Sequence, residues 1–280
     1  MRIFLILLSL LCVCLALPAL AQDKKESTYE RVMRTGVLRC GYASFQPSIM
    51  IDAASGKISG IAYDLVQKMG EMLNLKIEWS AETGYGEIIE GFRTGKYDMF
   101  CAMTSPTPER AKASVFTTPL YYSAIGVWVR ADDARFDKDY RLLNNPAYLL
   151  STKDSDLQES IADSDFPKAK KIAIPQMADA SQNLLDVAAG KADATFIEPY
   201  YAGLMLAKNP GTIKNVAENH PVRLFPNVLV LPAEEFQMKM MIDTVLNELI
   251  YRGEVEKIVE KHTGRKDAYL PVAQPYKAAE

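Results

Sequence analysis

The seven-residue segment Thr-Ser-Pro-Thr-Pro-Glu-Arg, which ends at Arg110, contains side chains that could hold an anion. Thr107 is a favourable N-cap, and Pro108 suits the first position of a helix. Ser105 supplies a hydroxyl, the helix start supplies free backbone N–H groups, and Arg110 supplies a planar set of donors that fits a carboxylate. The alternative is that Arg110 pairs with Glu109 or another acid on the surface. The spacing does not separate these two interpretations.

A second candidate is Glu198, which directly follows the apolar run 194–197 and precedes Pro199. If the protein has two parts that face each other, Glu198 could oppose Arg110 across a cleft. One part would then hold the carboxylate of a ligand, and the other would hold its ammonium group. The alternative is a solvated cap in front of a helix that begins at Pro199, and Glu198 taken alone favours this simpler interpretation.

Common catalytic and metal-binding motifs are missing from the sequence. His220 and His262 are its only histidines, and neither has the spacing of a metal ligand or a catalytic triad. Gly84 and Gly86 begin like a dinucleotide-binding fingerprint, but Ile89 stands in place of the third glycine. The 32 basic and 35 acidic residues argue against a nucleic-acid partner. We therefore predict no enzyme activity, no metal, no cofactor and no nucleic-acid binding.

The elements that position Arg110 alternate between strands and helices. We expect a short buried strand at 37–41, a strand of alternating pattern at 76–79 and a strongly apolar strand at 97–103, with helices at 64–73 and 88–92. This order predicts the α/β class, with a mainly parallel sheet covered by helices. The helix that carries Arg110 would then start at the carboxyl end of a strand, which is where such sheets bind ligands.

A similar unit returns 95 residues later. Gly-Lys-Tyr-Asp at 95–98 and Gly-Lys-Ala-Asp at 190–193 each join an expected helix to an expected strand. Strands at 171–174 and 194–197 enclose a helix around 183–188, whereas 144–167 is expected to be loop with a short helix. The repeat predicts two lobes. We place the first part of lobe 1 at 36–127, lobe 2 at 128–222, and a return to lobe 1 with two helices at 223–280.

Residues 1–21 have the pattern of a cleavable secretory signal. Arg2 is followed by the apolar run 3–17, and small residues stand at Ala19 and Ala21. The alternative is a membrane anchor, but the apolar run is short for a full span and is followed by Pro18. We predict cleavage after Ala21, a periplasmic protein, and a polar, frayed or loosely helical segment at 22–35.

Cys40 and Cys101 are the only cysteines after the predicted signal. Each lies in an expected strand, and an oxidising compartment would permit a disulfide between them. The alternative is two small buried hydrophobic side chains without a bond. The sequence slightly favours this alternative.

Several ordered motifs resemble those of the periplasmic amino-acid-binding proteins, the polar amino acid class of solute-binding proteins that serve ABC transporters. The similarity covers nearly the whole chain after the signal and is weak between 132 and 169. The motifs that carry it are Gly60-Ile61-Ala62-Tyr63-Asp64-Leu65, Gly95-Lys96-Tyr97-Asp98, Thr107-Pro108-Glu109-Arg110, Phe116-Thr117-Thr118-Pro119-Leu120-Tyr121, Gly190-Lys191-Ala192-Asp193 and Arg252-Gly253-Glu254-Val255.

The resemblance implies a monomeric two-lobed clamp with two hinge crossings that closes over its ligand. In similar proteins the arginine at the position of Arg110 binds the α-carboxylate of the ligand, with help from the hydroxyl at Ser105. The acid at Glu198 binds the α-amino group. The aromatic residue at Phe45 packs on the ligand side chain, and the backbone carbonyl at Met103 accepts from the ammonium group.

This chain also departs from the family pattern at positions near the expected ligand. Tyr42 or Ala43 stands where an acid is usual, and Ile61 stands where an aromatic clamp is frequent. Met177-Ala178 occupy the place of an expected Gly-Thr pair in lobe 2. Glu198 replaces the commoner aspartate. We expect Tyr42 and Ile61 to contact the ligand, in a pocket that is less charged and partly apolar.

The leading hypothesis is a binding protein that delivers an amino acid or similar small carboxylate to the inner-membrane permease of an ABC transporter. One alternative is an enzyme on the same fold, similar to the cyclohexadienyl dehydratases, in which a buried Glu198 is a general acid. Another alternative is a binding protein that serves a membrane sensor. The sequence does not separate the transporter from the sensor.

Overall fold

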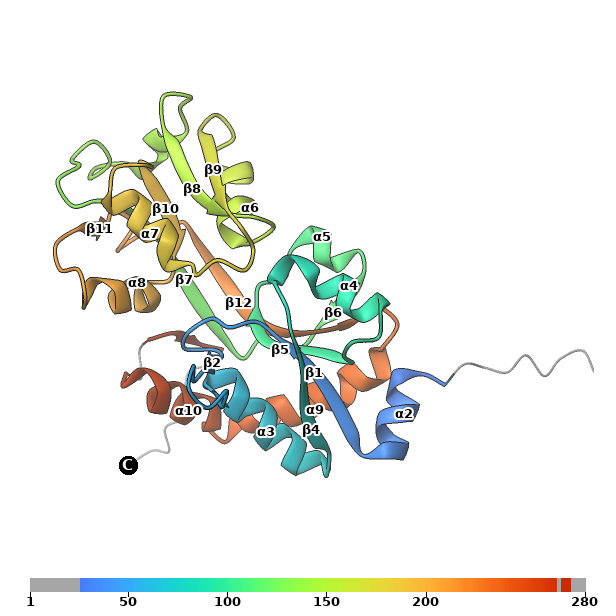
Figure 1. Cartoon of the computed structure of the whole chain (residues 1–280). Coiled ribbons are helices and arrows are strands. Elements are labelled where there is room, and N and C mark those ends of the chain that lie inside the picture. Colours follow the sequence, from blue (N-terminus) through green and yellow to red (C-terminus); the bar gives the residue numbers. More distant parts are fainter. Residues whose placement is uncertain (1–25, 266–267, 273–280) are drawn as a thin grey trace, which may run out of the picture.

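The computed structural model describes residues 26–265 and 268–272, so the predicted signal peptide lies outside the described residues. The chain folds into two α/β lobes that two long strands connect (Figure 1). The strands form one sheet in the order β4-β1-β5-β12-β7-β10-β8-β9. The first three strands belong to the first lobe and the last three to the second, as the α/β prediction requires.

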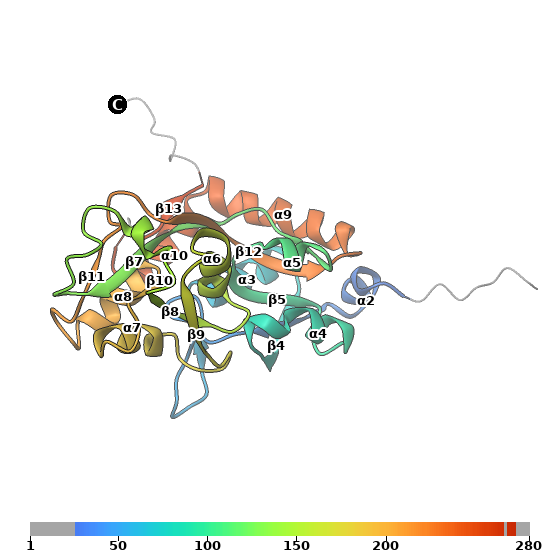
Figure 2. The same cartoon turned by 90° about the horizontal axis from the view of Figure 1, so that it is seen from above.

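The first lobe is built around three parallel strands, with β1 in the middle. They are β1 (Val37–Tyr42), β4 (Lys76–Glu82) and β5 (Met99–Thr104). Strand β5 is buried at every position, because helices cover both of its faces. The covering helices include α3 (Ile61–Leu73), α4 (Ile88–Arg93), α9 (Phe236–Tyr251) and α10 (Glu254–Thr263), and Figure 2 shows α9 and α4 on opposite sides of this sheet. The short strands β2 (Met50–Ile51) and β3 (Ile58–Ser59) form a separate hairpin.

The second lobe contains one parallel strand more than the sequence predicts. Its parallel strands are β8 (Leu149–Lys153), β9 (Lys170–Ile174) and β10 (Ala194–Ile197), and its helices are α6 (Leu157–Asp165), α7 (Ser181–Ala188) and α8 (Pro199–Leu206). The expectation of loop with a short helix at 144–167 was therefore wrong about β8. Its Ser151 and Thr152 look like loop residues in the sequence, but both side chains are fully buried.

Two antiparallel strands connect the lobes. They are β7 (Tyr121–Arg130) and β12 (Arg223–Pro232), which pair with each other and with strands of both lobes. The first half of β7 also pairs with β13 (Leu270–Pro271), and the second half pairs with β11 (Ile213–Asn215). Strand β6 (Ser114–Phe116) pairs with β12. The lobe boundaries placed at 127/128 and 222/223 stay a prediction.

The repeated Gly-Lys-x-Asp motif has the same local structure in both lobes. Gly95 and Gly190 adopt left-handed backbone angles, with φ of 65° and 70°. A residue with a Cβ atom is strained in this region, so glycine suits the end of each helix. The aspartates that follow, Asp98 and Asp193, accept backbone N–H groups from Arg39 and Leu149 respectively. The motif thus fixes where each returning strand begins.

The polar segment expected to be frayed or loosely helical forms a capped helix at its end. Helix α2 (Thr28–Thr35) begins after Ser27, whose hydroxyl accepts from the Glu30 backbone N–H. The Glu30 side chain in turn accepts from the Ser27 backbone N–H. This reciprocal capping box satisfies two N–H groups that a helix start otherwise leaves free.

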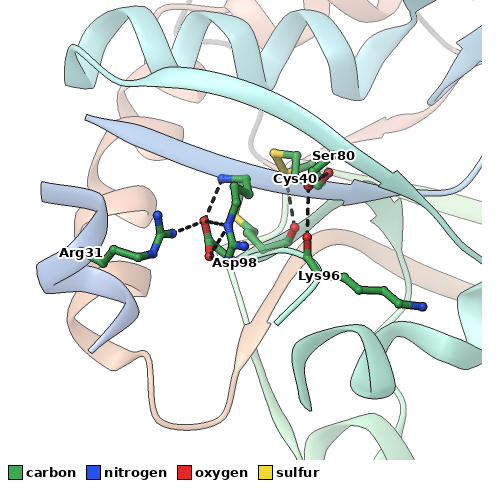
Figure 3. The surroundings of a disulfide bond; sticks show 8 residues. Arg31, Cys40, Ser80, Lys96 and Asp98 are labelled. Carbon is green, nitrogen blue, oxygen red and sulfur yellow. Dashed lines mark hydrogen bonds and ion pairs between the residues drawn. A yellow bond between two sulfur atoms is a disulfide. The ribbon is translucent and has the colours of Figure 1, made fainter. Parts of the chain in front are cut away.

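Cys40 and Cys101 form a disulfide, so the slight preference for two unbonded side chains was wrong (Figure 3). Cys40 lies on β1 and Cys101 on the adjacent parallel strand β5, where Cys40 is paired with Met99. This register brings the two Cα atoms to 5.5 Å, which is within the range of a disulfide. Beside it, Asp98 pairs with Arg31 (Figure 3). Asp98 also pairs with Arg39.

No helix in the described ranges is long and apolar enough to cross a membrane.

Candidate functional site

Arg110 lies on α5 (Pro108–Ala111), directly after the carboxyl end of β5. The Thr107 hydroxyl accepts from the Arg110 backbone N–H at 3.3 Å, so Thr107 is the N-cap that the sequence predicts. The cap and Pro108 set the start of the helix, and the short turn after β5 points the Arg110 side chain back toward the sheet. The local sequence therefore determines the start of the helix that carries Arg110.

The Arg110 guanidinium is buried among neutral acceptors. Its Nη1 donates to the Thr104 hydroxyl at 3.1 Å and the Ser105 carbonyl at 3.0 Å, and its Nη2 donates to the Tyr85 carbonyl at 3.2 Å. The residue is only 9% exposed and makes no ion pair with a carboxylate in the described part of the chain. A surface pair with Glu109 is therefore not formed. Burial lowers the pKa of Arg110, and the nearby charge of Asp156 opposes this shift.

Glu198 lies at the carboxyl end of β10, immediately before α8. Its side chain makes no capping hydrogen bond with α8, so the alternative of a solvated helix cap is not what the structure shows. Burial raises the pKa of Glu198 to about 7. The negative charge of Asp156 adds to the increase, whereas a hydrogen bond from Ser123 opposes it. At neutral pH this carboxyl group is therefore close to half protonated.

Arg110 from the first lobe and Glu198 from the second line the same cavity. We call it the cleft cavity. Its other lining residues come from both lobes and from the connecting strands: Phe45, Ser48, Tyr85, Met103, Thr104, Ser105, Thr107, Tyr121, Asp156, Leu157, Gln158, Asn227 and Tyr269. The structure thus brings Arg110, Ser105, Glu198, Phe45 and Met103 together, as expected.

Contacts with neighbouring residues hold Phe45 and Met103 in place at the cavity. The Phe45 ring stacks on Tyr201 of α8, with ring centroids 4.7 Å apart and an interplanar angle of 7°. The Met103 carbonyl, expected to accept from a ligand, accepts from the Tyr85 hydroxyl at 3.3 Å. The Met103 backbone N–H donates to the Ser48 hydroxyl at 3.1 Å.

Tyr42 and Ile61 do not line the cleft cavity, contrary to expectation. Tyr42 ends β1 and makes an edge contact with Trp79, at a centroid distance of 5.7 Å. Ile61 is fully buried in the core of the first lobe, and its N–H donates to the Pro47 carbonyl. Both side chains pack within the first lobe. The turn after β1 brings Phe45 to the cavity.

Sequence reasoning missed several lining residues because it missed β8. Asp156 follows β8 and is the N-cap of α6, where its carboxylate accepts from the Leu157 N–H at 2.7 Å. The residues after the first strand of the second lobe are therefore 154–156. Met177 and Ala178 follow β9 and line a different cavity, so placing them at the Gly-Thr position was wrong.

Tyr85, Tyr121 and Tyr269 also line the cleft cavity, and burial raises the pKa of each tyrosine. The Tyr121 and Tyr269 rings contact each other at a centroid distance of 4.7 Å. Tyr85 stands between two glycines, which was the available signal for a constrained position. Tyr269 comes from the C-terminal segment, which carries no such signal.

The cavity offers no evident metal site. Across residues 26–265 and 268–272, no group of three or more His, Cys, Asp or Glu side chains could hold a metal ion. What the arrangement can do is bind both ends of a zwitterion, because a guanidinium and a carboxyl group face the same space from opposite lobes.

The chain matches the model of the bacterial extracellular solute-binding proteins, family 3, over residues 38–265. A probable amino-acid ABC transporter-binding protein of Haemophilus influenzae is 31% identical over 104 residues, which are 37% of this chain and 40% of that protein. The chain thus spans less than half of this relative. The cyclohexadienyl dehydratase of Pseudomonas aeruginosa is 23% identical over 224 residues, which are 79% of this chain and 81% of the enzyme.

Solved structures share the two-lobed fold. An ancestral amino acid-binding protein, described as a precursor of cyclohexadienyl dehydratase, has a TM-score of 0.72 and 24% identity, covering 85% of this chain and 99% of that one. An amino acid ABC transporter substrate-binding protein of Streptococcus pneumoniae bound to L-arginine has a TM-score of 0.70 and 19% identity, covering 85% and 98%. Since the family model covers most of the chain, the protein belongs to the bacterial extracellular solute-binding proteins, family 3.

Proposed function

We propose that this protein binds an amino acid or similar small carboxylate in the cleft cavity and delivers it to the inner-membrane permease of an ABC transporter. Arg110 and the Ser105 hydroxyl would hold the ligand carboxylate, and Glu198 would hold its ammonium group. The protein would act as a monomer in the periplasm after removal of residues 1–21.

The observation that carries this proposal is the buried guanidinium of Arg110, which lines the cleft cavity without a carboxylate partner among the described residues. A charge withdrawn from water costs free energy unless an opposite charge compensates it. A ligand carboxylate would supply that charge with the two parallel hydrogen bonds that arginine favours. The transport-related name of the Haemophilus influenzae relative supports the same ligand class.

The direct test is isothermal titration calorimetry on residues 22–280, purified after unfolding and refolding to remove any carried ligand. The panel comprises the standard amino acids and small mono- and dicarboxylates. We expect saturable binding of at least one compound and a loss of about a hundredfold or more in Arg110→Ala, because hydrogen bonds to charged groups contribute about 1.5–3 kcal/mol each. Arg93→Ala is the matched control, since Arg93 is exposed in the same lobe and pairs with Glu90 on the surface.

Two results would contradict the proposal. One is the absence of binding by every compound in the panel. The other is an Arg110→Ala variant that binds as tightly as the wild-type protein. A control Arg93→Ala that retained its affinity would show that the loss in Arg110→Ala comes from the cleft cavity and not from a general change of charge.

A second candidate function, acid catalysis, is favoured by Glu198. A carboxyl group with a pKa of about 7 inside a cavity can donate a proton at neutral pH. The similarity to a cyclohexadienyl dehydratase adds to this candidate. Turnover of prephenate or arogenate that Glu198→Gln abolishes would support catalysis. Binding of these compounds without turnover would exclude it for them.

A further inference from the structure

A second cavity adjoins the cleft cavity. Phe45 and Tyr85 line both of them. The remaining lining residues of this distal cavity are Ala43, Ser44, Gln46, Glu82, Thr83, Gly84, Lys153, Gln176, Met177, Ala178, Asp179, Ala180 and Tyr201. They come from the turn after β1, the end of β4 and the turn that follows it, the end of β8, the segment after β9, and α8. A molecule held by Arg110 and Glu198 could therefore extend past the two shared aromatic rings into the distal cavity.

The distal cavity is lined by a little-exposed lysine that has no hydrogen-bond or ion-pair partner among the described residues. Lys153, the last residue of β8, is only 7% exposed, and its ammonium group makes no hydrogen bond or ion pair with any of the described residues. A lysine that is so little exposed is rarely found in proteins unless it is paired. The position therefore indicates a partner that the described residues do not supply.

A second polar atom of the distal cavity also lacks a partner. The side-chain oxygen of Gln176 is buried and has no hydrogen bond to the described residues. Rotation of this amide by 180° would exchange the oxygen for the NH₂ group, which can donate to an anion. Two unpartnered polar groups in one cavity argue that its occupant is polar.

The two acids of the distal cavity are placed differently from Lys153. Asp179 and Glu82 are both exposed, so water screens their charges. Asp179 already accepts from the Tyr201 hydroxyl and from the Ser181 N–H, each at 2.8 Å. Burial alone would raise its pKa, but these hydrogen bonds and the charge of Lys153 outweigh that effect and lower it. Lys153 is thus the least exposed of the charged residues that line this cavity.

We propose that the distal cavity is a subsite for a second anionic group of the ligand, so that the protein prefers amino acids whose side chain ends in a carboxylate. This inference rests on the proposed function of the cleft cavity. Lys153 supplies the compensating charge, and Gln176 supplies a hydrogen bond. Phe45 and Tyr85 border the apolar middle of the ligand.

The same charges disfavour a cationic side chain. L-Arginine is the ligand of the Streptococcus pneumoniae structure with the same fold. In this chain a side chain of that kind would bring a second positive charge toward buried Lys153, and like charges repel strongly where water is excluded. Specificity would then differ between these proteins although the fold is shared.

The test compares five probes by calorimetry at pH 8: L-glutamate, L-2-aminoadipate, L-glutamine, L-norleucine and L-lysine. We expect one of the two dicarboxylates, whichever has the matching length, to bind at least tenfold more tightly than the other three probes. Lys153→Met should remove this preference, with a loss of about ten- to a hundredfold for the dicarboxylate. Lys153→Arg, which keeps the charge, should retain most of it. Lys208→Met changes an exposed lysine at the end of α8 and should bind like the wild type.

The outcomes separate the two proposals. Tighter binding of L-glutamine, L-norleucine or L-lysine, or an unchanged dicarboxylate affinity in Lys153→Met, would overturn the subsite while leaving the proposed function intact. No binding of any amino acid or small carboxylate, or a bound ligand whose affinity Arg110→Ala leaves unchanged, would overturn the proposed function and the subsite with it. Circular dichroism of Lys153→Met and Lys153→Arg checks that both variants are folded. If Lys153→Met does not fold, a Lys153→Arg variant that loses the preference would overturn the subsite.

Discussion

Phe45 of the first lobe and Tyr201 of the second lobe stack face to face, with ring centroids 4.7 Å apart and an angle of 7° between the rings. Phe45 lies in the turn after β1, and Tyr201 lies on α8, which follows Glu198 directly. Both rings line the distal cavity, and Phe45 also lines the cleft cavity. This aromatic contact therefore joins the two lobes beside the place where the ligand is proposed to bind.

Phe45→Ala should weaken ligand binding by about tenfold, because an aromatic pair contributes about 0.5–1.5 kcal/mol beyond its buried area. Tyr201→Phe keeps the ring and removes the hydroxyl that donates to Asp179, so it should retain most of the affinity. Calorimetry with the tightest ligand measures both variants. Small-angle X-ray scattering should show that Phe45→Ala without ligand is more extended than the wild type. Equal affinities for Phe45→Ala and wild type would contradict a role of the stack in closure.

Glu198 should make the stability of the ligand-free protein depend on pH. Burial raises its pKa from the ordinary value of 4.5 to about 7. Between these two pH values the folded state therefore holds a proton that the unfolded state has released. Stability from this group is therefore present below about pH 4.5 and is lost as pH rises to 7, by up to about 3 kcal/mol at 1.36 kcal/mol per pKa unit. Urea unfolding at pH 5, 6, 7 and 8 measures this loss.

Glu198→Gln is the matched comparison, because glutamine is isosteric and does not titrate. As pH rises, the unfolding free energy of the wild type should fall relative to that of Glu198→Gln. An ammonium-bearing ligand should show the opposite trend and bind more tightly above pH 7, where Glu198 is ionised. A difference that stays constant from pH 5 to 8 would show that Glu198 titrates alike in both states.

The Cys40–Cys101 disulfide should stabilise the protein by about 2–4 kcal/mol, because it restricts the unfolded chain across a sequence separation of 61 residues. The Cys40→Ala, Cys101→Ala double variant should lose this amount in urea unfolding and keep the fold. A thiol assay on denatured, unreduced residues 22–280 should detect no free thiol, and reduction should release two. Two thiols without reduction would contradict the disulfide.

Gly91→Ala should destabilise the first lobe. A Cβ atom at Gly91 would lie 2.0 Å from the Tyr97 hydroxyl oxygen, and one at Gly41 would lie 2.5 Å from the same ring. The Tyr97 side chain is buried between them and donates to the Ile88 carbonyl at 3.0 Å, so it has little room to move. Overpacking of this kind costs about 1–3 kcal/mol, measurable by urea unfolding.

Gly203→Ala provides the control for Gly91→Ala. Gly203 lies on α8, and a Cβ atom there would meet no other atom within 4 Å. Within a helix, alanine is more favourable than glycine by up to about 1 kcal/mol. Gly203→Ala should therefore leave the stability unchanged or increase it. If the two variants lost equal stability, the effect would not come from contact with Tyr97.

Features that depend on neighbouring residues could be predicted from the sequence. The start of α5 is determined by Thr107 and Pro108, and the ends of two helices are determined by Gly95 and Gly190. The apolar run of β5 indicates a buried strand without further information. For this reason Arg110 and Glu198, which each follow a strand with a clear apolar pattern, were recognised as candidates, and the order of elements predicted two lobes.

Other features depend on contacts between distant parts of the chain. Strand β8 looks polar, but the buried Ser151 hydroxyl donates to Asn183, and its carbonyl accepts from Thr195. Without those partners the segment is indistinguishable from a loop, so Asp156 and Lys153 were missed. The disulfide likewise depends on the register of β1 against β5.

The sequence by itself determined that a guanidinium and a carboxyl group follow the strands of two α/β lobes. The tertiary structure decided that both line one cavity, that Tyr42 and Ile61 pack elsewhere, and that a buried Lys153 lies in the cavity beside it. The physical reason is that hydrophobic periodicity and caps act over a few residues. Burial and the pairing of charges depend on which segments meet in the folded chain.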